Sequence, residues 1–126
     1  MSYINESHLE ILQHEGLLGL SFYKNEINIL ETRLIEVAGK NTGLDASMEI
    51  EHFQNQIIVQ RNNISELRHK INKQVQLMSR YILIYGDQID NRHLEEDSLL
   101  IEEYKSLEKV IKELRHQFND FLIKYM

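Results

Sequence analysis

The chain has 126 residues, of which 42% are hydrophobic and 27% charged, with five glycines and no proline, cysteine or tryptophan. This apolar content excludes a disordered chain, and the length suits a single domain over residues 1–126. Without cysteine there is no disulfide framework and no thiol nucleophile. The formal net charge of −6 argues against nucleic acid and anionic membranes as partners, because binding to both depends on positive charge.

Three long segments show the helical spacing of apolar residues, and two short breaks separate them. We expect helices at about 4–38, 46–85 and 91–125, with Gly39 ending the first and Asp45 capping the second. Short connections make neighbouring helices antiparallel. The sequence therefore predicts an all-α fold, an elongated antiparallel up-down-up three-helix bundle with coiled-coil-like packing.

Each predicted helix carries one apolar stripe that should form the core. In the third helix the apolar residues follow alternating steps of four and three, which is the heptad pattern of knobs-into-holes packing. Gln60 replaces an apolar residue in the second stripe, where it would set the register of the helices; a buried functional amide is the alternative. The stripes comprise Leu9, Leu12, Leu20, Tyr23, Ile27, Leu30, Leu34 and Val37; Ala46, Ile50, Phe53, Ile57, Ile64, Leu67, Ile71, Val75, Met78, Ile82 and Tyr85; and Leu100, Tyr104, Leu107, Ile111, Leu114, Phe118, Phe121 and Tyr125.

The first helix has a second line of apolar residues, roughly 130° from its core stripe when residues are placed about 100° apart. The line comprises Ile4, Ile11, Leu18, Phe22 and Ile29. One apolar face suffices for packing inside a closed bundle, so this line needs another surface. We interpret it as an interface, which predicts a homodimer or a helical protein partner. A wide buried arc within a distorted bundle is the alternative.

Gly16 and Gly19 lie inside the same helix, where glycine costs roughly 1 kcal/mol relative to alanine. A close approach of another helix, a kink near Gly16 or a ligand-sized gap would each explain them. We expect close packing or a kink.

The spacing Glu-x-x-His occurs twice, at Glu66 and His69 and at Glu113 and His116. Helical di-iron proteins supply a carboxylate and an imidazole at this spacing, from side chains that face the bundle interior. Here helical phase places each pair roughly 140–160° from the centre of its core stripe, so both pairs should face solvent. We therefore predict no metal site and no cofactor. The sequence also lacks nucleophile elbows, phosphate loops and dinucleotide fingerprints, so we expect no catalytic residue and no enzyme.

Two segments, Phe22–Ile27 and Glu51–Gln56 continuing to Glu66–His69, resemble a group of small helical proteins of Bacteroidetes-type bacteria. The resemblance covers roughly the first two predicted helices and implies a helical cytoplasmic protein. The group has no assigned activity, so no catalytic residue carries over. The resemblance also draws attention to the outer face of the second helix as a partner-binding face, at His52, Gln56 and His69.

These observations predict a non-enzymatic helical interaction or scaffolding module that self-associates or docks a partner through the first helix. The first eight residues lack the features of a signal peptide, and no apolar run approaches the roughly 18 residues that span a bilayer, so we expect a cytoplasmic protein. The alternative is a helical bundle that binds a metal or a small ligand through His and Glu. Polar site candidates are His8, Glu15, Glu26 and Arg33, between the two apolar faces of the first helix, and His52, Gln56 and His69.

Overall fold

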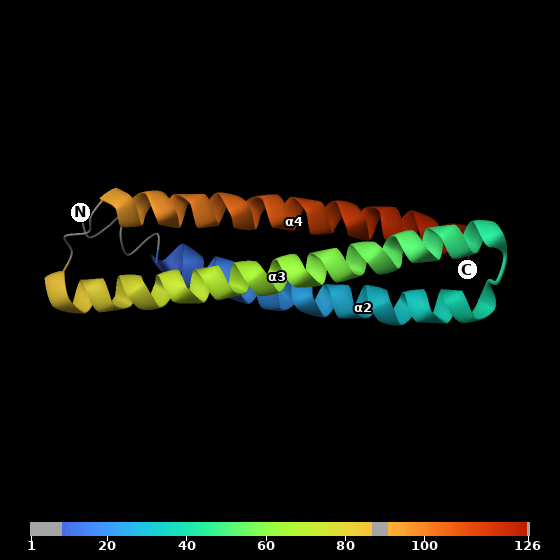
Figure 1. Cartoon of the computed structure of the whole chain (residues 1–126), viewed down its shortest axis with the longest axis horizontal. Coiled ribbons are helices and arrows are strands. Elements are labelled where there is room, and N and C mark those ends of the chain that lie inside the picture. The colour runs from blue at the N-terminus through green and yellow to red at the C-terminus, as the bar shows by residue number, and fades with distance from the viewer. Residues whose placement is uncertain (1–8, 87–90, 126) are drawn as a thin grey trace.

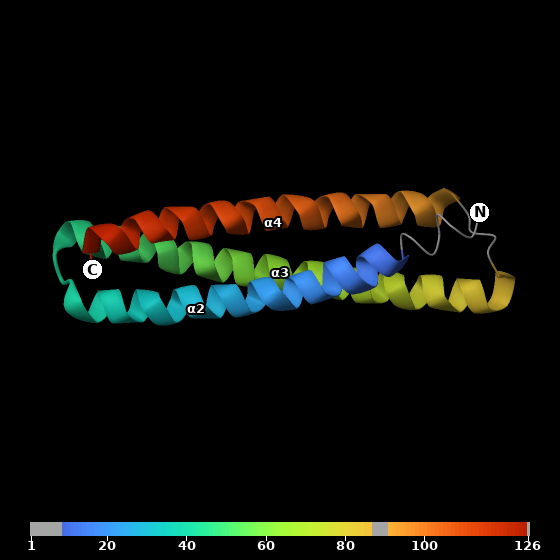
Figure 2. The same cartoon turned by 180° about the vertical axis from the view of Figure 1, so that it is seen from behind.

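The structure of the chain, a computed structural model, describes residues 9–86 and 91–125, which are almost entirely helical. Its elements in chain order are the π-helix η1 (Ile11–Leu17) and the α-helices α2 (Leu18–Lys40), α3 (Leu44–Tyr85) and α4 (Asn91–Tyr125). η1 runs directly into α2, α3 returns antiparallel to it, and α4 runs in the direction of α2 (Figure 1, Figure 2). The predicted all-α, elongated three-helix bundle is confirmed.

The core lies along the axis of the bundle, where each helix contributes one apolar stripe. Steps of three and four residues keep these side chains on the side of each helix that faces its two neighbours. The predicted stripe of α2 is buried from Leu20 to Val37, and that of α4 is buried from Tyr104 to Phe121. The stripe of α3 is buried from Ala46 to Ile71, with Gln60 at the position where the sequence places it.

The last turns of α3 depart from the predicted stripe. After Ile71 the buried residues are Gln74 and Met78, whereas Val75 is half-buried and Tyr85 is exposed. The burial pattern continues the alternation of three and four residues that precedes it, as a supercoiled helix requires. Val75 still packs against the edge of the core, whereas the prediction of Tyr85 as a core residue was wrong because it followed apolarity instead of this period.

The connection between α2 and α3 is closed by hydrogen bonds different from those predicted. Asn41, not Gly39, ends α2: its backbone N and its Nδ2 donate to a carbonyl of the last turn at 3.1 and 3.0 Å. The same Nδ2 lies 3.3 Å from the carbonyl oxygen of Tyr125, which ties the end of α4 to this connection. Gly43 precedes α3 as its N-cap, whereas Asp45 lies within the first turn.

Gly86 ends α3, and its amide donates to the carbonyl of Ile82 at 2.8 Å. Its φ of 68° lies in the left-handed region, which a β-carbon disfavours. The need for that conformation explains why glycine stands at this helix end.

The π-helix η1 begins the first rod and contains Gly16. Its hydrogen bonds close over five residues instead of four, so each turn holds an extra residue relative to an α-helix. Leu12, Gly16 and Leu20 are consequently the buried residues, at steps of four. A kink near Gly16 is one of the predicted explanations for that glycine. The structure shows a departure from regular α-helix at this place, in the form of a π-helix.

Candidate functional site

The outer surface of α2 carries an exposed line of large apolar side chains. Leu18, Phe22 and Ile29 are 63%, 52% and 49% exposed, and we call these three residues the outer apolar face. The opposite side of the same helix is buried against α3 and α4. The side chains that would need a covering surface are therefore present on α2 as predicted, although the line is shorter than predicted.

Ile11 does not lie on this face. It is half-buried, because the π-helix shifts the angular position of residues before Leu18 by about one residue, or roughly 100°, relative to a regular α-helix. Ile4, the remaining predicted interface residue, lies outside the described residues. The structure thus corrects the prediction that Ile11 extends the line.

Charged residues lie beside the outer apolar face, among them Arg33, which lines a shallow hollow together with Ile29. Between Leu18 and Leu30 the charged residues are Lys24 and Glu26, and Glu26 Oε1 lies 3.5 Å from Arg115 of α4. This ion pair joins α2 to α4 within one chain. Another surface could cover the face without taking an unpaired carboxylate out of water.

The other polar residues predicted beside Glu26 do not gather around it. Glu15 and Arg33 are exposed on η1 and α2, and neither forms an ion pair with a described residue. His8 lies outside the described residues. The described part of the chain therefore does not bring these polar candidates together into one site on this helix.

A cluster of two tyrosines and one carboxylate joins α2 to α4. The Tyr23 hydroxyl donates to Glu108 Oε2 at 2.8 Å, and the Tyr104 hydroxyl donates to the same oxygen at 3.2 Å. Burial, followed by the charge and the hydrogen bond of Glu108, raises the pKa of Tyr104 to about 12. Burial and the hydrogen bond to Glu108 also raise the pKa of Tyr23. Both phenols therefore stay protonated at neutral pH, which suits a structural role and not that of a base.

Gly19 makes this cluster fit. A β-carbon at Gly19 would overlap the Tyr104 hydroxyl and lie 2.7 Å from its Cζ. A β-carbon at Gly16 would meet only the Cδ1 of Ile71, at 3.3 Å. Close packing against α4 is thus the explanation for Gly19, and the space beside it is filled by Tyr104 instead of a ligand.

Three buried polar side chains lie between α3 and α4. Gln74 Nε2 donates to Asp97 Oδ1 at 2.7 Å, and both residues are buried. The sequence reasoning missed this pair, because a polar residue interrupts an apolar stripe. Continuing the heptad of α4 backwards from Tyr104 by seven residues would have found Asp97. Gln60, the third buried polar residue, accepts one long hydrogen bond of 3.4 Å from Asn63.

The two Glu-x-x-His pairs face solvent, as helical phase predicts, since all four side chains are exposed. Across residues 9–86 and 91–125, no three His, Asp or Glu side chains come close enough together to hold a metal ion. Two of the predicted partner-binding residues of α3, His52 and Gln56, lie about one turn apart, and His69 lies more than three turns further along the helix. His52 and His69 are exposed and Gln56 is half-buried.

No protein-family model, curated protein or solved structure matches the chain. The resemblance to small helical proteins of Bacteroidetes-type bacteria therefore stays a prediction. Within the two described ranges, no helix is both long and apolar enough to cross a membrane. The functional proposal below therefore depends on the exposed side chains and the contacts of the bundle itself.

Proposed function

We propose that this protein is a non-enzymatic helical interaction module that forms a homodimer through the outer apolar face of α2. The observation that supports this proposal is the exposure of Leu18, Phe22 and Ile29 on a helix whose core face is already covered. Phe22 lies one turn from Leu18, so an aromatic and an aliphatic side chain could form the centre of the contact. Large apolar and aromatic side chains at the centre commonly supply most of the energy of a small interface.

A second copy of the chain is the occupant that we infer for the outer apolar face. Each chain has a net charge of −6, so two copies repel one another over most of their surface. Beside the outer apolar face, Ser21, Asn25 and Asn28 are uncharged, Glu26 is paired with Arg115, and Arg33 lines a shallow hollow together with Ile29. Two identical helical faces can also meet about a two-fold axis, the commonest symmetry of homodimers.

The same charge supports two further parts of the proposal. A net charge of −6 is unfavourable for binding to the phosphates of nucleic acid or to an anionic membrane surface. We therefore propose that the binding partner is a protein, and not nucleic acid or a membrane. We also propose that the protein acts in the cytoplasm, as the resemblance implies.

Sedimentation equilibrium tests the dimer directly. The native chain should show twice the mass of 15.0 kDa at high concentration. Leu18→Lys should weaken association by about tenfold or more, because it places a charge at the centre of the apolar contact. The matched control is Leu99→Lys on α4, where the leucine is 64% exposed and lies outside the outer apolar face. This control should associate like the native chain.

Two results would contradict the proposed function. One is a mass of 15.0 kDa at millimolar concentration. The other is equal weakening by Leu18→Lys and Leu99→Lys, which would mean that general charge and not this face governs association.

A further inference from the structure

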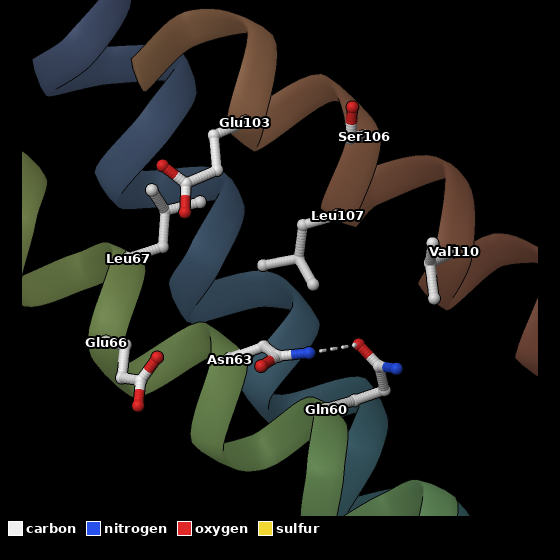
Figure 3. A pocket seen from close by; sticks show the side chains of 8 residues that line it. All are labelled: Gln60, Asn63, Glu66, Leu67, Glu103, Ser106, Leu107 and Val110. Atoms are coloured by element: carbon white, nitrogen blue, oxygen red, sulfur yellow. Dashed lines mark hydrogen bonds between the residues drawn. The ribbon is translucent and has the colours of Figure 1, made fainter. Parts of the chain in front are cut away.

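A groove of about 360 Å³ lies between α3 and α4, with α2 behind it (Figure 3). Leu67 and Leu107 provide apolar side chains, Leu107 in the middle of the groove and Leu67 beside Glu66 and Glu103 (Figure 3), and both residues are buried. Gln60 lies toward one end, whereas Glu66 and Glu103 lie toward the other end on facing helices (Figure 3). The groove thus offers an amide, an apolar floor and a pair of carboxylates in that order.

The Gln60 side chain has hydrogen-bonding capacity that the described residues do not use. It is 4% exposed, and its single hydrogen bond is the 3.4 Å contact in which its Oε1 accepts from Asn63. Its Nε2 donates to no described residue, and Figure 3 shows this nitrogen directed away from Asn63. The nitrogen borders the groove and is not fully buried, so solvent in the groove reaches it. A carbonyl oxygen entering the groove would supply the acceptor.

Gln74 provides the internal comparison. It occupies the same kind of position two heptads further along α3, but its Nε2 donates to Asp97 at 2.7 Å. The chain therefore satisfies one core glutamine with a dedicated carboxyl group and leaves the other facing a groove. A role in setting register would be served equally well by a Gln60 satisfied within the chain.

The carboxylates at the other end favour a cation. Glu66 forms no ion pair with any described residue. Glu103 Oε1 lies 3.2 Å from Lys70 Nζ, and this pair is about half exposed, so it is easily rearranged. A positive group between Glu66 and Glu103 would be held by charge-assisted hydrogen bonds.

We propose that this groove binds a lysine residue of a peptide, with its carbonyl oxygen on Gln60 Nε2 and its ammonium group between Glu66 and Glu103. The six residues from Gln60 to Glu66 rise about 9 Å along α3. The extended four-carbon stem of lysine separates its carbonyl oxygen from its ammonium nitrogen by about 8 Å at ordinary bond lengths. The stem would then lie over Leu107. This site does not involve the outer apolar face of α2, so the test of lysine binding and the test of the dimer are independent of one another.

The test is an NMR titration of the full-length, ¹⁵N-labelled protein with Nα-acetyl-lysine N-methylamide. We expect saturable shifts of the Gln60 and Asn63 side-chain amides and of the backbone amides near Leu107. Two probes separate the contributions: Nα-acetyl-norleucine N-methylamide lacks the cation, and n-butylamine lacks the carbonyl. Each should bind about tenfold more weakly, which corresponds to the loss of one good polar contact.

Two variants assign the contacts. Gln60→Leu continues the apolar stripe of α3, and Glu66→Gln changes an exposed residue, so both should keep the fold, which circular dichroism checks. Each should weaken binding of the lysine probe about tenfold. Glu113→Gln removes a carboxylate of α4 that does not line the groove, and it should bind the probe like the native protein. The proposal is overturned if n-butylamine binds as tightly as the lysine probe, if Gln60→Leu leaves binding unchanged, or if the shifts spread over acidic residues without saturating.

Discussion

At the scale of single residues, the smallest side chain of α2 determines where one of the largest side chains of α4 can lie. Gly19 leaves the space that the Tyr104 ring occupies, and the Tyr104 hydroxyl then reaches Glu108. Tyr23 of α2 donates to the same carboxylate. A glycine inside a helix, unfavourable by itself, therefore permits a hydrogen-bonded connection between two helices that the apolar stripe alone would not provide.

We predict that Gly19→Ala lowers the free energy of unfolding by about 1–3 kcal/mol, because the added β-carbon must displace the buried Tyr104 ring. This loss should exceed the roughly 1 kcal/mol that alanine contributes through helix propensity. The matched control is Gly39→Ala in the last turn of α2, where no atom lies within 4 Å of the added carbon. It should stabilise by about 0.5–1 kcal/mol. Urea denaturation followed by circular dichroism measures both, and stabilisation by Gly19→Ala would show that Tyr104 does not pack there.

At the scale of the elements, the period of the apolar residues predicts the three helices and most of the buried stripes. The period does not identify core positions that are occupied by polar residues, such as Gln74 and Asp97, because the buried stripes are predicted from apolar residues alone. It also fails at η1, since hydrogen bonds that close over five residues leave no mark in composition beyond a glycine such as Gly16. For this reason the sequence predicts Ile11 at the interface, whereas the structure shows it half-buried.

The buried pair of Gln74 and Asp97 connects α3 to α4 and gives a prediction about their pairing. Gln74→Leu should lower the free energy of unfolding by about 1–3 kcal/mol, because it removes a donor from a buried carboxyl group. The double variant Gln74→Leu/Asp97→Leu should recover part of this loss, since replacing both partners by apolar groups is far less costly than replacing one. Gln60→Leu should change stability by less than about 1 kcal/mol or increase it, because it removes an amide whose N–H groups have no acceptor among the described residues. A double variant less stable than the sum of its single changes would argue against the pairing.

At the scale of the whole molecule, the bundle is a long structure in which three helices pack side by side along most of its length, and the described parts of α3 and α4 extend beyond η1 at one end (Figure 1). The sequence predicts this architecture because proline is absent and the connections are short. It also predicts an apolar surface on the first helix that includes Leu18, whereas an isolated exposed leucine such as Leu99 gives no comparable signal in a helical pattern. The sequence could single out Phe22 and Ile29 beside Leu18, but only the structure shows that a groove adjoins Gln60 and that Glu26 is already paired.

The response of the whole bundle to alkaline pH tests the connection between α2 and α4. The pKa of Tyr104 is raised from 10.0 to about 12 in the folded protein, and that of Tyr23 is also raised, so the folded state resists the loss of these protons. The stabilisation is therefore fully present below pH 10.0 and is lost as the pH rises from there through about 12. Glu108→Gln removes the carboxylate that contributes to both shifts, so its free energy of unfolding should fall less steeply over this window. Tyr85→Phe, which changes an exposed tyrosine, should keep the native pH dependence. Denaturation curves recorded at intervals from pH 8 to pH 12 supply the comparison, and identical slopes for Glu108→Gln and the native chain would mean that this carboxylate does not hold the two phenols.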